Sequence, residues 1–426
     1  TKRETSGTSN TLDEYRFYDG FEKIIQSKFE AENNKQIVQD VYYDKFVRVG
    51  EQSNPYFVDF SASYSEPNQT VDKANFSYDV LDRIVKIINP DDTKRTMSYS
   101  HWNTTTYDEN NNRKDSKIDA YGRIVEVKEH NNGNIYVTTY DYNPAGNLLG
   151  IKDNQGNTFN FSYDSLGRKI GMKDPDLGIW SYGYDKVGNL INQTDNRNMT
   201  TTLKYDKLNR VVKKNSSDES VTYDYDINKN NTLSGILINN IIINYSYDNR
   251  LRKISEDKTI DSMKLTVNWT YDTMDRITSK ILPTETISYS YNARGLMSEI
   301  NGIANISYNE QGQPINRGYN NKLTTSFNYN ISNFRLLQIK TSALQDLNYS
   351  YDNIGNVKGI NDAVNSKIYS MNYDDLDRLV YTNIDNSVSN DEVLNFAYNS
   401  IGDMLNMTIN NDNITFSYGN LAHAPA

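Results

Sequence analysis

The chain has 426 residues, and its 45 lysines and arginines against 55 aspartates and glutamates give a net charge of −10 at pH 7. This acidic balance argues against a nucleic-acid partner, because binding to phosphate backbones needs clustered Lys and Arg. Because the chain has no cysteine, disulfide scaffolds, thiolate metal sites and cysteine nucleophiles are excluded. The 34 tyrosines against 8 prolines indicate amphipathic sheets with one or both faces in water.

The sequence contains no stretch suited to a membrane-spanning helix. Its most apolar segment, residues 236–243, is interrupted by Asn239 and Asn240 and has the length of a strand. The chain begins at Thr1 without an apolar leader, which predicts a mature product or an excised fragment. Residues 18–34 fit a short amphipathic helix, although the start Tyr18-Asp-Gly-Phe fits the repeat described next better.

One repeat runs along the chain from residue 18 onwards. Each copy begins with Tyr, continues with Asp or Asn, has Gly, Asn or Asp in the fifth place of most copies, and then Arg or Asn before an aliphatic residue. The copies are 21 residues apart from Tyr142 to Tyr205 and 17 to 25 apart elsewhere, except for gaps of 35 and 40 around Tyr78. Clear copies begin at Tyr78, Tyr142, Tyr163, Tyr184, Tyr205, Tyr271, Tyr291, Tyr351, Tyr373 and Tyr398, and weaker ones at Tyr18, Tyr43, Ile118, Tyr225, Tyr247, Tyr308 and Tyr329.

The residue types of the repeat predict β-hairpins. Asp or Asn after the Tyr bonds its own backbone two residues on and starts a turn. Gly, Asn or Asp three places later tolerates the left-handed backbone that a bulged hairpin loop requires. The runs on both sides alternate with period two, as in residues 123–128 and 158–163, which indicates strands.

The number of strands predicts a curved sheet. Seventeen copies of two strands give about 34 strands, or a ribbon about 160 Å wide at ~4.8 Å per strand. Open twisted sheets rarely exceed ~10 strands without curling. We therefore predict an all-β fold, a hairpin array that curls into a spiral or hollow shell.

The repeat also accounts for most residues that might carry chemistry. His101, His130 and His423 have no metal-ligand spacing, and turn capping explains the recurrent aspartates better than a glycosidase pair does. Residues 108–112 open like a calcium loop, but the sixth and twelfth places, Arg113 and Asp119, do not fit one. The recurrent arginines are expected to donate hydrogen bonds beside the Asp of their own turn, and the tyrosines to form a structural row.

The predicted site is accordingly structural, with no catalytic, cofactor-binding or metal residue. Its signature residues are Tyr78, Asp79, Tyr163, Asp164, Gly167, Arg168, Tyr184, Asp185, Gly188, Tyr205, Asp206, Arg210, Tyr271, Asp272, Arg276, Tyr351, Asp352, Gly355, Tyr373, Asp374 and Arg378.

Segments 163–169, 184–190 and 351–357 resemble the YD repeats of Rhs proteins, teneurins and the B and C components of Tc insecticidal toxins. Residues 4–9, 18–27, 54–57, 106–124 and 174–182 resemble the stretch where Tc-toxin B-type proteins begin their repeats. The resemblance implies an Rhs-type cocoon segment, a hollow β-shell that encloses a C-terminal toxic domain. The family's self-cleaving Rhs-core ending is absent, and the last residues of the chain resemble a segment that normally precedes that core.

We therefore expect one YD-repeat segment over residues 1–426, with a Tc-toxin-B-like opening region (1–60), irregular repeats (61–140) and regular repeats (141–426). The expected function is non-enzymatic encapsulation in a secreted or cell-surface toxin, without a cofactor. Expected partners are a protein cargo, other toxin subunits or a second copy paired through sheet edges. The alternatives are an adhesive or filament-forming surface protein that binds glycans or proteins, and a repeat-fold hydrolase.

Overall fold

The computed structural model describes residues 2–3, 11–386, 391–410 and 412–417. Every regular element in these ranges is a β-strand, so the all-β prediction is confirmed. Residues 18–34 contain the end of one strand at Tyr18, a turn and the strand Ile24–Ala31, as the repeat pattern favoured over a helix. The described residues include no helix of the length and apolar character needed to cross a membrane.

Residue contacts group the chain into two compact units. Unit 1 joins Thr1–Val137 to Tyr289–Phe416, and unit 2 is built mainly from Thr138–Ser288. Strands β14 (Asn134–Tyr142) and β28 (Thr286–Tyr291) each begin in one unit and end in the other. The assignment of residues 1–426 to a single segment stays a prediction.

Unit 1 contains two runs of strands, which we call the first run (β3–β13) and the second run (β29–β40). Its short strands β1 (Lys2–Arg3) and β2 (Thr11–Leu12) form a separate pair. The first run comprises β3 (Glu14–Tyr18), β4 (Ile24–Ala31), β5 (Lys35–Tyr43), β6 (Val49–Ser53), β7 (Tyr56–Asp59), β8 (Lys73–Tyr78), β9 (Ile84–Ile88), β10 (Lys94–Ser100), β11 (Asn103–Tyr107), β12 (Arg113–Ile118) and β13 (Ile124–Asn131). The second run comprises β29 (Met297–Ile300), β30 (Ala304–Tyr308), β31 (Pro314–Tyr319), β32 (Thr324–Tyr329), β33 (Leu336–Thr341), β34 (Gln345–Tyr351), β35 (Val357–Asp362), β36 (Lys367–Tyr373), β37 (Leu379–Asn386), β38 (Glu392–Tyr398), β39 (Met404–Ile409) and β40 (Asp412–Thr415).

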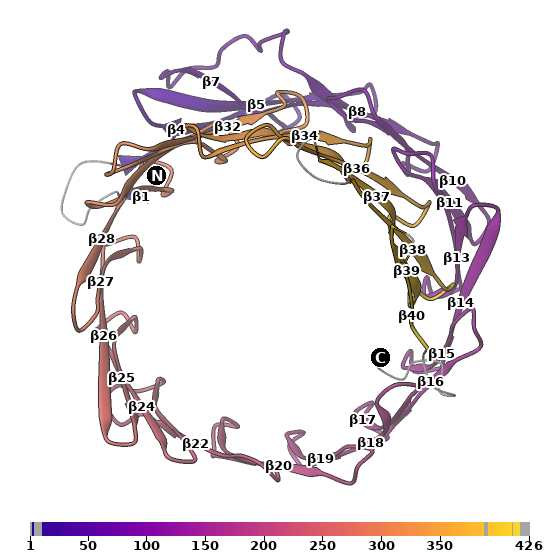
Figure 1. Cartoon of the computed structure of the whole chain (residues 1–426), viewed down its shortest axis with the longest axis vertical. Coiled ribbons are helices and arrows are strands. Elements are labelled where there is room, and N and C mark those ends of the chain that lie inside the picture. Colours follow the sequence, from indigo (N-terminus) through magenta and orange to yellow (C-terminus); the bar gives the residue numbers. More distant parts are fainter. Residues whose placement is uncertain (1, 4–10, 387–390, 411, 418–426) are drawn as a thin grey trace. The chain divides into compact units, whose positions relative to one another are not determined.

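Unit 2 is a single layer of hairpins that follow one another in chain order, drawn in magenta to salmon in Figure 1. Its complete strands are β15 (Leu148–Lys152), β16 (Thr158–Tyr163), β17 (Lys169–Asp174), β18 (Gly178–Tyr184), β19 (Leu190–Thr194), β20 (Thr200–Tyr205), β21 (Val211–Asn215), β22 (Ser220–Tyr225), β23 (Leu233–Ile238), β24 (Ile241–Tyr247), β25 (Lys253–Ile260), β26 (Met263–Tyr271) and β27 (Ile277–Ile281).

Strands β3–β40 belong to one antiparallel sheet of 38 strands. Almost every strand pairs with the next strand in the chain, as the hairpin prediction requires. The exception lies at β5, which pairs with β4, β6 and also β7, while β6 pairs with β8. In the described register, β3, β7 and β40 each have one partner strand.

The exception at β5 explains the first wide gap in the repeat spacing. After β6 the chain turns back to place β7 beside β5, with Lys35 opposite Asp59, and then crosses residues 60–72 before β8 begins. The second wide gap contains one additional hairpin, β10–β11, between two copies of the repeat. Both gaps are therefore insertions between hairpins, and the repeat itself keeps its geometry.

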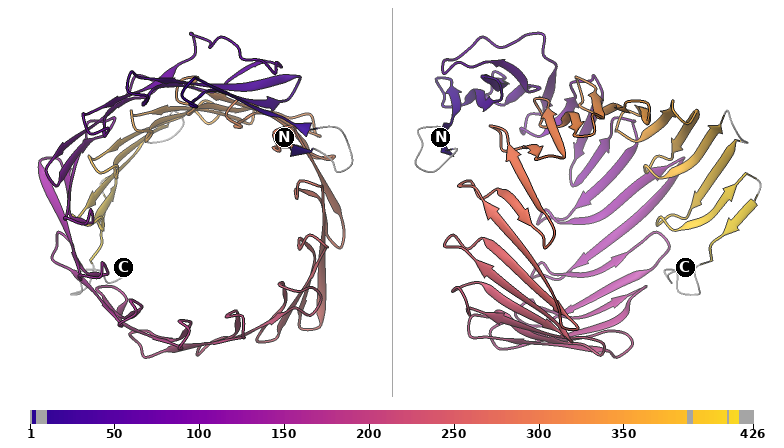
Figure 2. Two further views of the ribbon diagram at one scale, coloured as in Figure 1. Left: turned by 180° about the vertical axis from the view of Figure 1, so that it is seen from behind. Right: turned by 60° about the vertical axis from the view of Figure 1, so that its left-hand side comes forward.

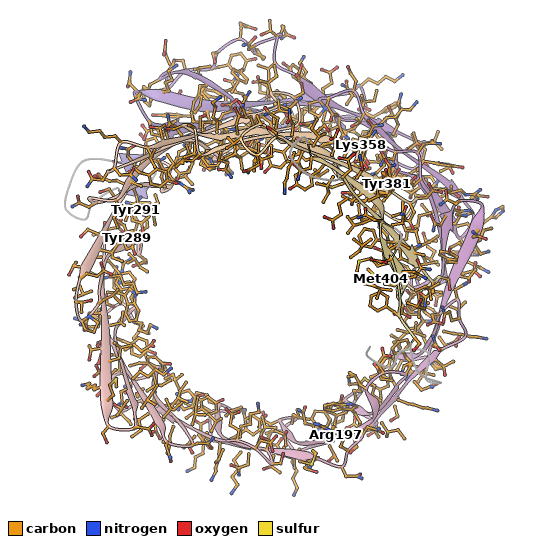
Figure 3. The ribbon with its side chains drawn as sticks, in the orientation of Figure 1. Arg197, Tyr289, Tyr291, Lys358, Tyr381 and Met404 are labelled. Atoms are coloured by element: carbon orange, nitrogen blue, oxygen red, sulfur yellow. The ribbon has the colours of Figure 1, made fainter. Side chains whose placement is uncertain are left out.

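The hairpins carry very little apolar core, which agrees with the low hydrophobicity of the sequence. The buried apolar side chains of the described residues are Ala31, Ile37, Val38, Val221 and Ala304. Side chains project from both faces of the ribbon, as Figure 3 shows. Stability must therefore come largely from backbone pairing and from polar contacts that recur in every repeat.

Four of the five largest fully buried side chains of the described residues are polar, and all five lie on β4 and β5. The loop of residues 60–72 bonds three of them. Gln26 and Lys28 donate to the carbonyl oxygens of Ser65 and Ser63, at 2.9 and 2.7 Å. Gln36 accepts from the backbone N–H of Ser61 at 3.0 Å. This loop therefore covers one face of the first hairpins through hydrogen bonds to its backbone.

A β-bulge occurs where each signature tyrosine ends its strand, and the turn that follows imposes a left-handed residue in the fifth place. Gly167 and Gly188 have φ of 77° and 102° there. Glu22, Val47 and Leu251, which depart from the sequence pattern, are held at φ of 59°, 62° and 63°. The turn thus overrides the ordinary backbone preference of these three residues, at a cost of about 1 kcal/mol each.

Replacing Val47 with Gly should therefore raise the free energy of unfolding by about 1 kcal/mol, because a β-branched residue is strained at positive φ. Thermal unfolding of the purified chain checks this. Val80→Gly is the matched control, because Val80 is 97% exposed in an equivalent turn and is absent from the positive-φ residues. The control should be neutral or slightly destabilising, and equal gains in both variants would contradict the strain explanation.

Candidate functional site

The recurrent site of this protein is the turn that begins with the residue after each signature tyrosine, which we call the YD turn. In the repeat of Tyr163, the Oδ1 atom of Asp164 accepts hydrogen bonds from the backbone N–H groups of Leu166 and Arg168, both at 2.9 Å. The backbone N–H of Asp164 donates to the carbonyl oxygen of Arg168 at 3.0 Å. One carboxylate oxygen therefore closes the turn.

The second carboxylate oxygen holds the arginine of the same turn. Arg168 donates through Nε to Oδ2 of Asp164 at 2.6 Å, and through Nη1 to the carbonyl oxygen of Asp185 at 3.1 Å. Its guanidinium also lies 4.9 Å from the ring centre of Tyr184. Arg168 thus joins its own turn to the turn and the tyrosine of the following repeat.

The tyrosine of each repeat connects back to the preceding repeat through its hydroxyl group. Tyr184 donates its hydroxyl hydrogen to the carbonyl oxygen of Lys169, the first strand residue after the preceding YD turn, at 2.9 Å. Tyr205, Tyr351 and Tyr373 bond the equivalent carbonyl oxygens of Leu190, Leu336 and Val357 at 2.8, 2.7 and 2.9 Å. The tyrosines therefore act through hydroxyl bonds and cation–π contacts.

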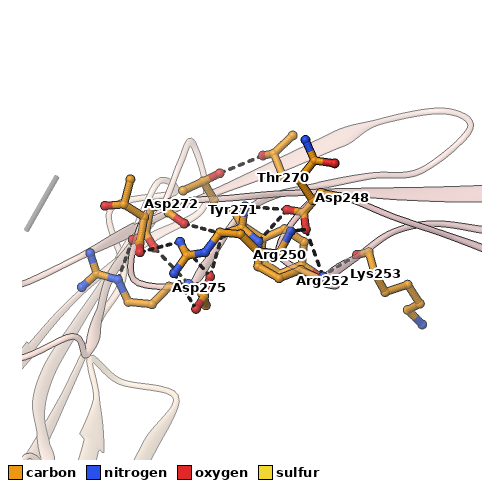
Figure 4. A network of polar contacts seen from close by, with 12 residues as sticks. Asp248, Arg250, Arg252, Lys253, Thr270, Tyr271, Asp272 and Asp275 are labelled. Atoms are coloured by element: carbon orange, nitrogen blue, oxygen red, sulfur yellow. Dashed lines mark hydrogen bonds and ion pairs between the residues drawn. The ribbon is translucent and has the colours of Figure 1, made fainter. Parts of the chain in front are cut away.

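Figure 4 shows this connection in unit 2, between the repeats of Asp248 and Asp272. Arg252 donates to Oδ2 of Asp248 at 2.6 Å, to the carbonyl oxygen of Asp272 at 2.6 Å and to Oδ1 of Asp275 at 2.9 Å. Tyr271 donates to the carbonyl oxygen of Lys253 at 2.6 Å. A single guanidinium thus contacts three groups in two successive turns.

The arginine contacts shift the titration of the capping carboxylates. In Asp79 and Asp119, the side-chain hydrogen bond from the arginine of the same turn holds the pKa below its usual range, and the backbone N–H groups lower it further. A depressed pKa in the folded state gives stability above the unfolded pKa, and this stability is lost as the pH falls through the folded value. The turns are therefore built for neutral pH and weaken in strong acid.

The structure places every predicted tyrosine at the end of its strand and every predicted aspartate at the start of a YD turn. Asp185 and Asp352 have Asn189 and Asn356 where other turns have Arg, and each amide donates to Oδ2 of its aspartate at 2.9 Å. The signature residues end or follow β8 (Tyr78, Asp79), β16 (Tyr163, Asp164, Gly167, Arg168), β18 (Tyr184, Asp185, Gly188), β20 (Tyr205, Asp206, Arg210), β26 (Tyr271, Asp272, Arg276), β34 (Tyr351, Asp352, Gly355) and β36 (Tyr373, Asp374, Arg378).

Sequence reasoning missed two uses of the same turn. The Oδ1 atom of Asp108 accepts from the backbone N–H groups of Asn110 and Asn112 at 2.9 and 2.7 Å, so the segment considered as a calcium loop is a capped turn. Asp153 caps a turn at the other end of the strands in the same way. The signal was present in both cases. Tyr107 precedes Asp108 and Asn111 lies three places after it, and Asp153 has Gly156 three places after it but Lys152 in place of the tyrosine.

Of the three histidines considered above, His130 has a carboxylate neighbour. His130 lies 2.7 Å from Oδ2 of Asp115, which also contacts Arg113. His423 lies outside the described residues. The described part of the chain has no group of three or more His, Asp or Glu side chains placed to hold a metal ion.

Within unit 1 the two runs lie next to each other, as Figure 2 shows, and contact each other through the turns at their strand ends. The YD turns of the second run meet the turns at the opposite strand ends of the first run, and we call this contact the seam. Asn333 donates to Oδ2 of Asp91 at 2.8 Å, and Asn110 donates to Oδ2 of Asp352 at 2.9 Å. Both pairs are separated by 242 residues.

The seam continues on both sides of these two contacts. Asn131 donates to Oδ2 of Asp374 at 3.2 Å, and the backbone N–H of Asn132 donates to Asp375 at 2.7 Å. Arg294 pairs with Glu32 at 3.0 Å. Successive turns of one run therefore contact successive turns of the other through carboxylates.

One seam carboxylate is unfavourably placed. Partial desolvation raises the pKa of Asp377, and the neighbouring carboxylates Asp108, Asp352 and Asp374 raise it further, although the residue as a whole is exposed. Asp377 accepts a hydrogen bond from Asn356 at 3.1 Å. An amide at this position would keep that acceptor and remove the repulsion.

Asp377→Asn should therefore stabilise unit 1 by about 0.5 kcal/mol at pH 7, the scale of an exposed charge interaction. A raised folded pKa means that the charged form destabilises the fold, so the gain should shrink as the pH falls and protonates Asp377. Thermal unfolding at pH 7 and pH 4 measures the difference. A gain that is the same at both pH values would contradict the electrostatic cause.

Comparisons with known proteins agree with this geometry. Residues 142–177 and 184–221 match the family model of the RHS Repeat. No curated protein matches the chain. The resemblance of the sequence to Rhs and YD repeats is thus confirmed by two consecutive segments of unit 2.

Several solved structures share the fold. The crystal structure of TcdB2-TccC3-Cdc42 superposes with a TM-score of 0.82 and 16% identity over 95% of this chain and 27% of that chain. TcdB2-TccC3 gives 0.82 and 17% over 94% of this chain and 27% of that one. A mutant Photorhabdus luminescens Tc holotoxin pore gives 0.81 and 16% over 95% and 26%. The chain therefore spans about a quarter of the length of these solved chains.

Proposed function

We propose that this chain, which carries RHS repeats and shares the fold of the TcdB2-TccC3 structures, is a non-enzymatic wall segment of a secreted Rhs- or Tc-like toxin. In this proposal the wall encloses a C-terminal toxic effector and keeps it from water, proteases and the producing cell. The partners are the effector and the other subunits of the toxin. The site of action is extracellular, in a secreted complex or at the cell surface.

The seam is the observation that carries the proposal. A sheet with little apolar core gains few contacts by folding into a compact lobe, but it can extend as a wall when successive passes join at their edges. In unit 1, hydrogen bonds to carboxylates join the passes at offsets of 242 and 243 residues between Asp91 and Asn132, and at offsets of 260 and 262 residues at Asp72 and Glu32. A regular contact of this kind supports a wall.

The contacts of the aspartates argue for structure over hydrolysis. A glycosidase needs two carboxylates facing each other across a substrate groove, with one of them free to give up a proton. The YD-turn aspartates instead accept two backbone hydrogen bonds and an arginine or asparagine bond each, as in Asp164 and Asp352. These contacts leave their carboxylates occupied.

Protease protection tests the proposal directly. The chain is expressed from its native locus with the neighbouring reading frames, and the purified complex is treated with trypsin. The associated effector should survive in the intact complex and be digested in the seam variant Asn110→Ala/Asn131→Ala. An effector digested equally fast in both would overturn the proposal.

An electron cryomicroscopy map of the same complex separates the alternative function. Enclosed density that does not belong to this chain supports encapsulation. End-to-end contacts between copies, with no enclosed density, would instead favour the adhesive or filament-forming protein and would overturn the wall proposal.

A further inference from the structure

Arginine side chains in this protein almost always have a carboxylate partner. Among the sixteen arginines whose side chains the structure describes, fourteen form an ion pair with Asp or Glu. Arg335 instead donates to the carbonyl oxygens of Asp352 and Asn353, both at 2.6 Å. Arg317 is the remaining one, and no carboxylate of the described residues pairs with it.

The surroundings of Arg317 are unlike those of a YD turn. Arg317 lies in the middle of β31, with its guanidinium 5.7 Å from the ring centre of Phe327 on β32. Side-chain hydrogen bonds with Arg317 and with Thr325 lower the pKa of Tyr319 from its ordinary value. Donors thus converge on one small region of the sheet, and no Asp or Glu of the described residues lines it.

This region is hollowed. A cavity of about 430 Å³, open to solvent, is lined by strands β31 to β33, the turn between β31 and β32, and the start of β34. Arg317 pairs with Thr325, and Thr325 pairs with Thr341, so these three side chains lie in a row on the same face of the sheet. All of these residues belong to unit 1.

The lining of the cavity combines one cation, several hydroxyl and amide groups, and apolar side chains. Thr325 and Thr341 bond each other through their hydroxyls at 2.7 Å, and Thr341 lies 3.4 Å from the side-chain oxygen of Gln345. Hydroxyls and amides both donate and accept hydrogen bonds. Phe327 and Ile339 supply the apolar surface beside them.

These groups match the parts of an acidic sugar. A guanidinium is the group best suited to a planar carboxylate, which it holds with two parallel N–H donors. Groups that both donate and accept suit sugar hydroxyls, and an aromatic ring suits the apolar face of a sugar ring. We propose that the hollow around Arg317 binds a carboxylated monosaccharide residue, a uronic or sialic acid.

The same lining argues against two other ligands. A phosphate group carries more charge than one guanidinium balances, and Arg317 is the only charged residue that lines the hollow among the described residues. A carboxylate on a peptide side chain requires donors alone and leaves the acceptors of Gln345 and the threonines unused. The proposal stands apart from the wall function, since it needs only the face of β31–β33.

Isothermal titration of the full chain with glucuronic acid and N-acetylneuraminic acid tests the proposal, with glucose and N-acetylglutamic acid as comparison ligands. At least one acidic sugar should bind saturably, and glucose and N-acetylglutamic acid should bind at least about tenfold more weakly. Arg317→Gln should weaken acidic-sugar binding at least about tenfold, because it removes the charge that pairs with the carboxylate. Thr341→Val should weaken it several-fold.

Arg197→Gln is the matched control, because the Arg197 side chain is 81% exposed in unit 2 and does not line the hollow. It should leave binding unchanged, and thermal unfolding of each variant shows whether the fold is kept. Absence of saturable binding by both acidic sugars would overturn the proposal. Binding that is unaffected by Arg317→Gln in a folded variant, or N-acetylglutamic acid bound as tightly as the sugars, would overturn it as well.

Discussion

Replacing Asp374 with Ala is expected to destabilise unit 1 by about 3 kcal/mol, the scale of breaking a buried ion pair. Asp374 accepts from the backbone N–H groups of Leu376 and Arg378, both at 3.0 Å, and from Arg378 Nε at 2.7 Å. It also accepts from Asn131 across the seam, and its side chain is only 4% exposed. Alanine would leave the Arg378 guanidinium, itself 17% exposed, without its carboxylate.

Asp164→Ala is the matched comparison, because Asp164 makes the same contacts within its turn and none of the seam contacts described for Asp374. Its side chain is 20% exposed, so a smaller loss of about 2 kcal/mol is expected. Thermal unfolding gives the two losses, and hydrogen exchange of residues 131–133 locates the additional effect. Equal losses, with unchanged exchange in that turn, would contradict an energetic contribution from the seam.

Asp374→Asn distinguishes the contribution of the backbone hydrogen bonds from that of the ion pair with Arg378. The amide oxygen can still accept both backbone hydrogen bonds, while the ion pair with Arg378 is lost. We expect Asp374→Asn to lower the free energy of unfolding by less than Asp374→Ala does. A loss equal to that of alanine would show that capping contributes little to this turn.

Gly178→Val should produce the other large effect, a loss of about 3 kcal/mol. Gly178 has φ of 70°, and a Cβ atom there would lie 2.2 Å from Cγ of Asn196. The Asn196 side chain cannot simply move away, because its Oδ1 atom accepts from the backbone N–H of Ile179 at 3.1 Å. Thermal unfolding of unit 2, followed by tryptophan fluorescence of nearby Trp180, measures the loss.

Two further variants identify the cause. Gly20→Val should be almost neutral, because a Cβ atom at Gly20 meets no atom within 4 Å. Asn196→Ala in the Gly178→Val background should recover the part of the loss caused by the clash and leave the part caused by the positive φ. A double variant no more stable than Gly178→Val would contradict the clash.

Local features of this fold could be predicted from the sequence because they depend on neighbouring residues. The turn after Tyr163 is determined by Asp164, Gly167 and Arg168 within five positions, and the structure shows these groups bonded to one another. The alternation around each tyrosine likewise indicates strands wherever it occurs. Even Val47, which breaks the pattern, adopts the turn because the flanking groups impose it.

Contacts between distant parts of the chain could not be predicted in this way. Asn110 resembles a ligand of a calcium loop in sequence, yet it bonds Asp352 because the number of residues between the two runs brings these turns together. The pairing of β7 with β5 also depends on a return of the chain that no local pattern announces. The hollow at Arg317 could not be predicted either, because no sequence motif indicates that Arg317 and Thr325 face each other on adjacent strands.

The pairing of nearly every strand with its successor has a consequence for synthesis on the ribosome. Each hairpin closes a short loop, so its entropic cost is small and it can form as soon as its two strands have emerged. The polypeptide can therefore acquire its architecture progressively from the amino terminus, with little exposed intermediate to aggregate. The seam differs, because Asp352 reaches Asn110 only after a further 242 residues have been translated. Folding of unit 1 thus ends with the formation of the seam, and this last step depends on the carboxylates that accept its hydrogen bonds.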